Sequence, residues 1–141
     1  MFSVCTEVIG DVAVVQCEGR LVHSEAAFQL RDAVMALRNS RVIAVDLSGV
    51  GAIEGGSLGM LAYLERWAHD HDIKLKLFNP RHSVSESLDR AWMPTLEIAS
   101  ADEIIALLDG AETRGSQNAW DGGHSQVGNA VVDLRRPHSN L

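Results

Sequence analysis

The sequence predicts an α/β fold, with a mixed β-sheet of about five strands flanked by about four α-helices. One observation is the order of the elements: stretches with β-type alternation and stretches with a helical apolar stripe follow one another as β-β-α-β-α-β-α-β-α. The other is the length, because 141 residues suffice for one domain with a sizeable core. Helices that alternate with strands favour parallel pairing, and an opening pair of strands adds an antiparallel edge.

A β-hairpin is expected to open the chain. The dipeptide Gly10-Asp11 separates two β-rich runs and predicts a type I′ turn. Cys5 and Cys17 lie inside these runs, and neither a CxxC motif nor a second cluster of metal ligands accompanies them. We therefore expect both cysteines to be small buried hydrophobes, with a metal or redox role as the alternative. The two runs cover residues 2–9 and 12–19.

Two amphipathic helices and a buried strand are expected next. Ser24 is suited to cap a helix over residues 24–39, and the continuous β-branched run at 42–45 is typical of a central strand covered on both faces. The glycine-rich stretch after that run predicts a tight loop, followed by a helix over residues 57–71. The apolar stripes of the two helices are Ala27, Leu30, Val34 and Leu37, and Leu58, Leu61, Leu64 and Ala68.

The second half of the domain predicts two more strands and two more helices. Residues 73–78 alternate charged and apolar side chains, as a strand near a sheet edge does, and residues 96–98 suit a short strand. Met93-Pro94 is expected to end the helix between them. The two helix starts with capping-box spacing are Ser83 with Glu86 and Ser100 with Glu103.

The domain is expected to span residues 1–110. Residues 111–141 are rich in glycine and asparagine and show no helical stripe, so they predict a disordered C-terminal tail. The apolar run at 130–134 leaves a docked extra strand as the alternative.

The charge balance bears on the class of partner. The chain has 12 basic and 19 acidic residues, a net charge of −7, and residues 111–141 contribute three charges of each sign. The whole excess therefore lies in residues 1–110. It argues against nucleic acid, whose binding depends on phosphate contacts, and favours a basic protein surface. A signal peptide is not recognisable and no run approaches the ~18 apolar residues of a membrane span, so we expect a cytoplasmic protein without membrane insertion.

Residues 42–61 are the most informative stretch, because a strand end, glycines and a helix start bring unpaired N–H groups and a helix dipole together. A phosphate-binding loop would need a lysine that is missing, and the glycines do not have GxGxxG spacing. GxSxG is present at 55–59, so a small hydrolase with Ser57 as nucleophile is a remote alternative. His69 and His71 lie roughly 18–21 Å further along the same predicted helix and point to different faces. No catalytic residue, cofactor or metal site is assigned.

Two motifs in this stretch resemble a known signature. Asp46 begins the sequence DLSGV, and after a short spacer Ile53 begins IEGGSLGML. Together they resemble the signature of STAS domains, the sulfate-transporter and anti-sigma-factor-antagonist family, whose usual form is DLSGV followed by IDSSGLG. The resemblance extends over residues 2–110 and gives the tail no counterpart. It implies a STAS-like sheet flanked by helices and a non-enzymatic, protein-binding module of bacterial transcription regulation.

The resemblance also implies a phosphorylation switch, called partner switching. In the family, an anti-sigma factor that is itself a serine kinase binds at this loop and helix, and phosphorylation of a serine there breaks the complex. A phosphate adds about −1.5 to −2 charges to a packed contact, which can expel a partner. Here Glu54 stands where the family has Asp, Gly55 and Gly56 where it has two serines, and Ser57 where it has Gly. Gly56 occupies the acceptor position, so the switch is lost or altered.

Ser57 is the one hydroxyl that could replace the acceptor. The alternative is an N-cap or first-turn residue of the following helix. Asp46 is expected to accept backbone N–H bonds that hold the loop, and Ser48 to do similar work. The glycines expected to permit positive φ and close approach of a partner are Gly49, Gly51, Gly55 and Gly56. The predicted partner-binding surface comprises Asp46, Ser48, Glu54, Gly55, Gly56, Ser57, Leu58 and Met60.

The expected partner is an anti-sigma factor or a related serine-kinase-like ATPase, bound by a monomer or a weak dimer of this chain. The main alternative is an accessory STAS subunit of an ABC-type lipid transport complex.

Overall fold

A five-stranded sheet with four helices forms the domain, as predicted. The computed structural model describes residues 1–91 and 96–120, with side chains through residue 113. The strands are β1 (Ser3–Ile9), β2 (Val12–Leu21), β3 (Val42–Ile53), β4 (Lys74–Phe78) and β5 (Glu97–Ala99). The helices are α1 (Ser24–Met35), α2 (Gly56–Asp70), α3 (His82–Ala91) and α4 (Ala101–Trp120).

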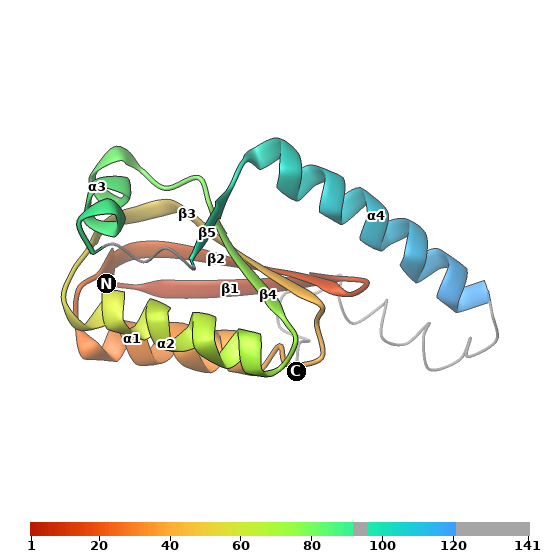
Figure 1. Ribbon diagram of the computed structural model, residues 1–141, viewed down its shortest axis with the longest axis horizontal. Coiled ribbons are helices and arrows are strands. Elements are labelled where there is room, and N and C mark those ends of the chain that lie inside the picture. The colour runs from red at the N-terminus through yellow and green to blue at the C-terminus, as the bar shows by residue number, and fades with distance from the viewer. Residues whose placement is uncertain (92–95, 121–141) are drawn as a thin grey trace.

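The strands lie in the order β1-β2-β3-β4-β5, so each strand neighbours the next one along the chain (Figure 1). β1 and β2 are antiparallel, and the other three pairs are parallel. Ile9 pairs with Val12 across a two-residue turn, in which Gly10 but not Asp11 has a positive φ. The predicted type I′ turn is therefore wrong, because it needs positive φ at both central residues, whereas a type II′ turn needs it only at the first.

Helices cover both faces of the sheet. α1 and α2 pack side by side on one face, and α4 lies across the other (Figure 1). Residues 42–45 of β3 are at most 1% exposed, so the predicted central strand is confirmed. The cluster under α1 and α2 includes Leu30, Val34, Ile43, Val45, Leu61 and Leu64. The smaller clusters under α4 include Val12, Val42, Ala44, Phe78, Ala99, Ile104 and Ala111.

The two cysteines lie on opposite faces of the hairpin and differ in burial. Cys17 is 2% exposed, as predicted, but Cys5 is exposed. Val4 and Val8 of β1 pack against the core under α1. Because successive residues of a strand point to opposite faces, the side chain of Cys5 lies on the other face of the sheet, which α4 covers only near the hairpin turn. The prediction that Cys5 is buried is therefore wrong.

The helix starts confirm one predicted cap and contradict two. The hydroxyl of Ser100 accepts the N–H of Glu103 at 3.1 Å, as the capping box predicts. Ser24 is not a cap, because α1 has His23 at its N-cap without a side-chain bond. Ser83 lies inside α3, and its hydroxyl donates to the carbonyl of Gly51 at 3.2 Å.

The last helix is longer than expected. α4 continues through residue 110 to Trp120, which corrects the predicted start of a disordered tail at 111. Ala111 is fully buried against the start of β2 and β3, and this contact continues the packing of Leu107 and Leu108. Residues 121–141, with the alternative strand at 130–134, lie outside the described residues, as do Met93-Pro94. Within the described ranges, none of the helices has the length and apolar character needed to cross a membrane.

A buried lysine links β4, β5 and α4, and the sequence did not single it out. The Lys76 side chain is 8% exposed, and its ammonium donates to Glu97 at 2.5 Å and to Glu103 at 3.0 Å. Lys76 and Glu97 are register partners in β4 and β5, and Glu103 lies in the first turn of α4. Burial lowers the pKa of Lys76, but the hydrogen bonds and charges of the two glutamates outweigh burial and raise its pKa overall.

We expect the double variant Glu97→Ala/Glu103→Ala to lose more stability than Lys76→Met. The double variant leaves a buried ammonium unpaired, which costs about 3 kcal/mol. Lys76→Met leaves two carboxylates that are 56% and 45% exposed and that water can solvate. Urea unfolding of the three proteins measures the difference. An equal or larger loss in Lys76→Met would show that the lysine is not the costly partner.

Candidate functional site

The predicted tight loop after residue 45 is instead a continuation of β3. The strand runs to Ile53, and only Glu54 and Gly55 connect it to α2. β2 is long enough to pair with this extension, from Glu18 opposite Gly49 to Leu21 opposite Ile53. Two register shifts interrupt the pairing. The loop prediction was wrong because glycines also occur at strand irregularities, which a single sequence does not distinguish from a turn.

Hydrogen bonds from the following segments hold the extension in place. A carboxylate oxygen of Asp46 accepts the N–H of Ser48 at 2.9 Å, which confirms the role expected for Asp46. Arg81 donates from Nε to the Ser48 carbonyl at 2.8 Å, alongside the Ser83–Gly51 bond. Arg81 and Ser83 were missed because a bond from a side chain to a backbone about 30 residues away leaves no local pattern.

The glycines of the stretch have different roles. A Cβ on Gly49 would lie 2.6 Å from the Cys17 carbonyl oxygen. The absence of a side chain at Gly49 therefore allows close approach of the β2 backbone, and not of a partner. Gly55 has φ +53°, whereas Gly49, Gly51 and Gly56 do not have positive φ. The expectation of positive φ therefore holds for Gly55 alone.

The start of α2 is an exposed stretch of backbone. Glu54, Gly55 and Gly56 are exposed, and a Cβ on either glycine would meet no atom within 4 Å. Gly55 is the N-cap and offers no capping side chain. The N–H groups of Ser57 and Leu58 donate to the carbonyls of Glu54 and Gly55, both at 3.0 Å. Two of the N–H groups that were expected to be unpaired are thus hydrogen-bonded inside the turn.

Ser57 points into the core. It is 2% exposed and shares the buried stripe of α2 with Leu61, Leu64 and Ala68. Its hydroxyl oxygen is buried and has no hydrogen-bond partner among the described residues. Ser57 is a first-turn residue and not the N-cap. A serine nucleophile needs a base within hydrogen-bond reach, and in the described part of the chain Ser57 has none.

Some of the predicted site residues line two separate hollows, and Gly56, Ser57 and Met60 line neither of them. Glu54, Gly55 and Leu58 line a groove of about 340 Å³ between the start of α2 and α3, with Ser87 and Arg90 on its other side. Asp46 and Ser48 line a hollow of about 510 Å³ on the sheet, with residues of β1 and β2. Glu54 lies eight positions after Asp46 in the chain, a distance of about 26 Å if the strand is fully extended. Met60 is half-buried and packs against the core.

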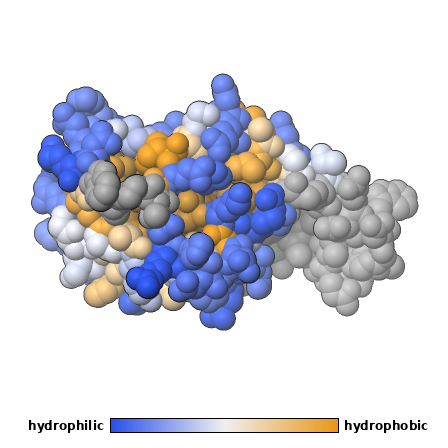
Figure 2. Space-filling model, in the orientation of Figure 1, coloured by the Kyte–Doolittle hydropathy of each residue, from blue (hydrophilic) through white to orange (hydrophobic). Residues whose placement is uncertain are grey.

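Two acidic residues, Glu18 and Asp46, line the sheet hollow together with Cys17. Burial and the nearby charge of Asp46 raise the pKa of the Cys17 thiol to about 12. Figure 2 shows the face of the molecule that carries α3 and α4. Apolar side chains are visible on this face between the two helices, and hydrophilic side chains divide them, so they do not form one continuous apolar patch.

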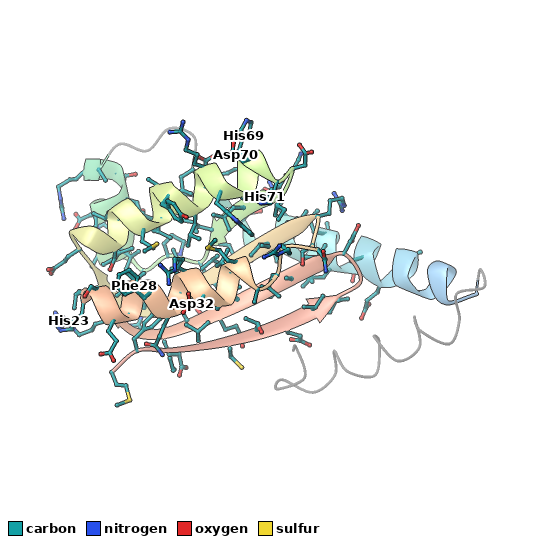
Figure 3. All side chains as sticks on the ribbon, turned by 90° about the horizontal axis from the view of Figure 1, so that it is seen from below. His23, Phe28, Asp32, His69, Asp70 and His71 are labelled. Carbon is teal, nitrogen blue, oxygen red and sulfur yellow. The ribbon has the colours of Figure 1, made fainter. Side chains whose placement is uncertain are left out.

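The histidines of α2 lie at its far end, away from both hollows (Figure 3). The ring of His71 lies 4.8 Å from that of Trp67, and its Nδ1 is 2.8 Å from the Trp67 carbonyl oxygen. The residues that the structure describes contain no group of three side chains suited to hold a metal ion.

Comparison with known proteins decides the family. The STAS domain model matches residues 3–105, well over half of the chain. This chain belongs to the STAS domain family. No curated protein sequence matches it.

Solved structures share this STAS fold at low sequence identity. The unphosphorylated form of the anti-sigma factor antagonist SpoIIAA aligns with a TM-score of 0.64 and 18% identity, over 77% of this chain and 97% of that one. An anti-sigma factor antagonist from Mycobacterium paratuberculosis aligns with a TM-score of 0.60 and 17% identity, over 77% and 95%. SLC26A9 aligns with a TM-score of 0.57 and 14% identity, over 82% of this chain but 22% of its own. These similarities show the fold.

We expect Gly49→Ala to destabilise this STAS domain and Gly51→Ala to leave it nearly unchanged. The new methyl group at Gly49 would collide with the β2 backbone, and overpacking of this kind costs about 1–3 kcal/mol. At Gly51 the nearest atom to a Cβ is 4.0 Å away, at the end of the Arg81 side chain. Thermal and urea unfolding test this, and equal stability of the two variants would contradict the close approach of β2 and β3.

Ser57→Ala is expected to keep or raise the free energy of unfolding, by up to about 1 kcal/mol, because it removes a buried hydroxyl without a partner. Ser100→Ala is the matched control, since it removes a capping bond and should cost about 1 kcal/mol. A clear loss of stability in Ser57→Ala would show that its hydroxyl is hydrogen-bonded.

Proposed function

We propose that this chain is a non-enzymatic regulatory module that binds an anti-sigma factor or a related serine-kinase-like ATPase in the bacterial cytoplasm. The observation that supports this most is the exposed segment Glu54-Gly55-Gly56 on a STAS fold. By the family signature, this segment holds the position of the phosphorylated serine. Two solved neighbours are described as anti-sigma factor antagonists, which favours the same class of partner.

The surface suits contact with a protein rather than a small molecule. Gly55 and Gly56 leave the backbone open to close approach. Leu58 offers half-buried apolar area in the groove beside them, and Met60 follows on the same helix. Glu54 supplies a negative charge that would attract a basic surface of the partner. We assign Asp46 and Ser48 to shaping the β3 extension, through their bonds within it and to Arg81.

The proposed binding is not controlled by phosphate at the usual position. Gly56 has no hydroxyl, and the neighbouring hydroxyl of Ser57 is buried. A phosphoryl group on Ser57 would bring about −1.5 to −2 charges into an apolar stripe, so a kinase could act there only after the start of α2 opens. We therefore propose that the switch by phosphorylation is lost at Gly56, and that any remaining switch at Ser57 requires this opening.

We expect Gly56→Asp to weaken partner binding at least tenfold, and Gly56→Asn to weaken it much less. The two side chains have the same shape, and open space surrounds the position, so the difference isolates the added charge. The measurement is titration of the full chain with each purified serine-kinase-like anti-sigma factor encoded by the same genome. Equal affinity of the two variants for a bound partner would exclude Gly56 from the interface.

Gly56→Ser is the complementary variant. It places a hydroxyl at the acceptor position, so a bound kinase with ATP should phosphorylate this variant and release it, while the unaltered chain stays bound. Mass spectrometry of both proteins measures whether a phosphoryl group has been added. Binding by none of these kinases, together with co-purification of an ABC-type membrane ATPase, would favour the accessory-subunit alternative.

A further inference from the structure

The first turn of α2 lacks features that stabilise the start of α4. Its N-cap, Gly55, has no side chain to accept a backbone N–H, and the turn contains no acidic residue to complement the helix dipole. At the start of α4, by contrast, the hydroxyl of Ser100 accepts the N–H of Glu103, and Asp102 and Glu103 supply negative charge. The start of α2 is therefore held by its backbone hydrogen bonds and by packing.

Two glycines inside α2 weaken its first turn further. Gly56 and Gly59 do not have positive φ, and a Cβ on either would meet no described atom within 4 Å. Neither the backbone conformation nor close packing therefore requires glycine at these positions. Glycine favours the helix less than alanine does, because it loses more conformational freedom when the helix forms.

The backbone hydrogen bond that closes this turn is long. The N–H of Gly59 donates to the carbonyl of Gly55 at 3.4 Å, and the N–H of Leu58 donates to the same oxygen at 3.0 Å. The equivalent bond of α4, from Ile104 to Ser100, measures 3.2 Å. Such bonds usually lie between about 2.7 and 3.2 Å, so the first regular bond of α2 is weak.

The first turn also contributes little to the core. Ser57 is 2% exposed, and its hydroxyl has no partner in the described part of the chain, so opening of the turn would let water solvate a buried polar group. Leu58 is the one apolar side chain of residues 55–59, and it is only half-buried. The fully buried stripe continues from Leu61, so the turn can open while the rest of α2 stays packed.

We propose that residues 55–59 form a local switch, in which the first turn of α2 opens on its own and exposes the Ser57 hydroxyl. Parts of a protein with few buried contacts and weak hydrogen bonds open far more often than the whole domain unfolds. The closed form is the one described above, with Glu54, Gly55 and Gly56 exposed and Ser57 buried.

This inference deepens the proposed function, because it concerns regulation of the same site and rests on that function for its use. The closed form presents the surface that we propose for the partner, whereas the open form makes Ser57 accessible to a kinase. A partner that binds only the closed form stabilises it, so partner binding and access to Ser57 oppose each other.

Thiol labelling of the full-length Ser57→Cys variant, in a Cys5→Ser background, measures the opening. Cysteine is close to serine in size, and Cys17, which is 2% exposed, is the internal reference. We expect the thiol introduced at position 57 to react at least about tenfold faster than Cys17. Its rate should change little with urea below the unfolding transition, because a local opening exposes little surface.

Gly59→Ala in the same background should slow labelling at position 57 about fivefold, because alanine favours the closed helical turn. Gly51→Ala is the matched control. It makes the same substitution in β3, where the nearest atom to a Cβ is 4.0 Å away, and should change the rate by less than about twofold. An equal effect of both variants, or no effect of Gly59→Ala, would exclude residue 59 from an opening segment.

Hydrogen exchange of the unaltered chain tests the opening without a cysteine variant. The amides of Gly59 and Ile104 occupy the same position in α2 and α4, since each donates to the carbonyl of its N-cap residue. After correction for intrinsic rates, the Gly59 amide should exchange at least about tenfold faster.

Equal protection of these two amides would overturn the proposal, as would labelling at position 57 as slow and as dependent on urea as that of Cys17. Neither measurement needs a partner. A chain that binds no kinase-like ATPase but shows the opening would contradict the proposed function alone, and a chain that binds one but shows no opening would contradict this inference alone.

Discussion

The pairing of β3 with β2 beyond Asp46 is the constraint on which the rest of the structure depends. The first half of β3 is the buried centre of the sheet, with α1 and α2 on one face and α4 on the other. The second half continues along β2 because Gly49 lets the two backbones approach closely. This extension decides where α2 begins, and therefore which residues of the glycine-rich stretch face solvent.

The same extension explains why the site is divided. Asp46 and Ser48 remain within the sheet, where hydrogen bonds and Arg81 hold the strand, while Glu54, Gly55 and Gly56 emerge at its end. The surface that we propose for recognition is thus a short exposed turn supported by an ordered strand. A surface of this kind can bind a protein without first paying the entropy of ordering a long loop.

The position of Ser57 bears on regulation. In a helix, a shift of one residue turns a side chain by about 100°, so the hydroxyl next to Gly56 faces the core and not solvent. The loss of a hydroxyl at Gly56 is therefore not compensated by its neighbour. STAS architecture is retained, and the described start of α2 has no exposed hydroxyl at positions 56 and 57.

The sequence by itself determined the order of the elements, the apolar stripes of α1 and α2, the burial of residues 42–45, the cap at Ser100 and the family signature, because these depend on local periodicity or on adjacent residues. Only the tertiary structure decided that β3 runs to Ile53, that Cys5 is exposed, that Lys76 is buried between two glutamates and that Ser83 bonds to Gly51. Each of these depends on a contact between segments far apart in the chain. The pairing of two strands and the neutralisation of a buried charge each need two segments that are distant in the sequence. The sequence of one segment therefore does not predict them.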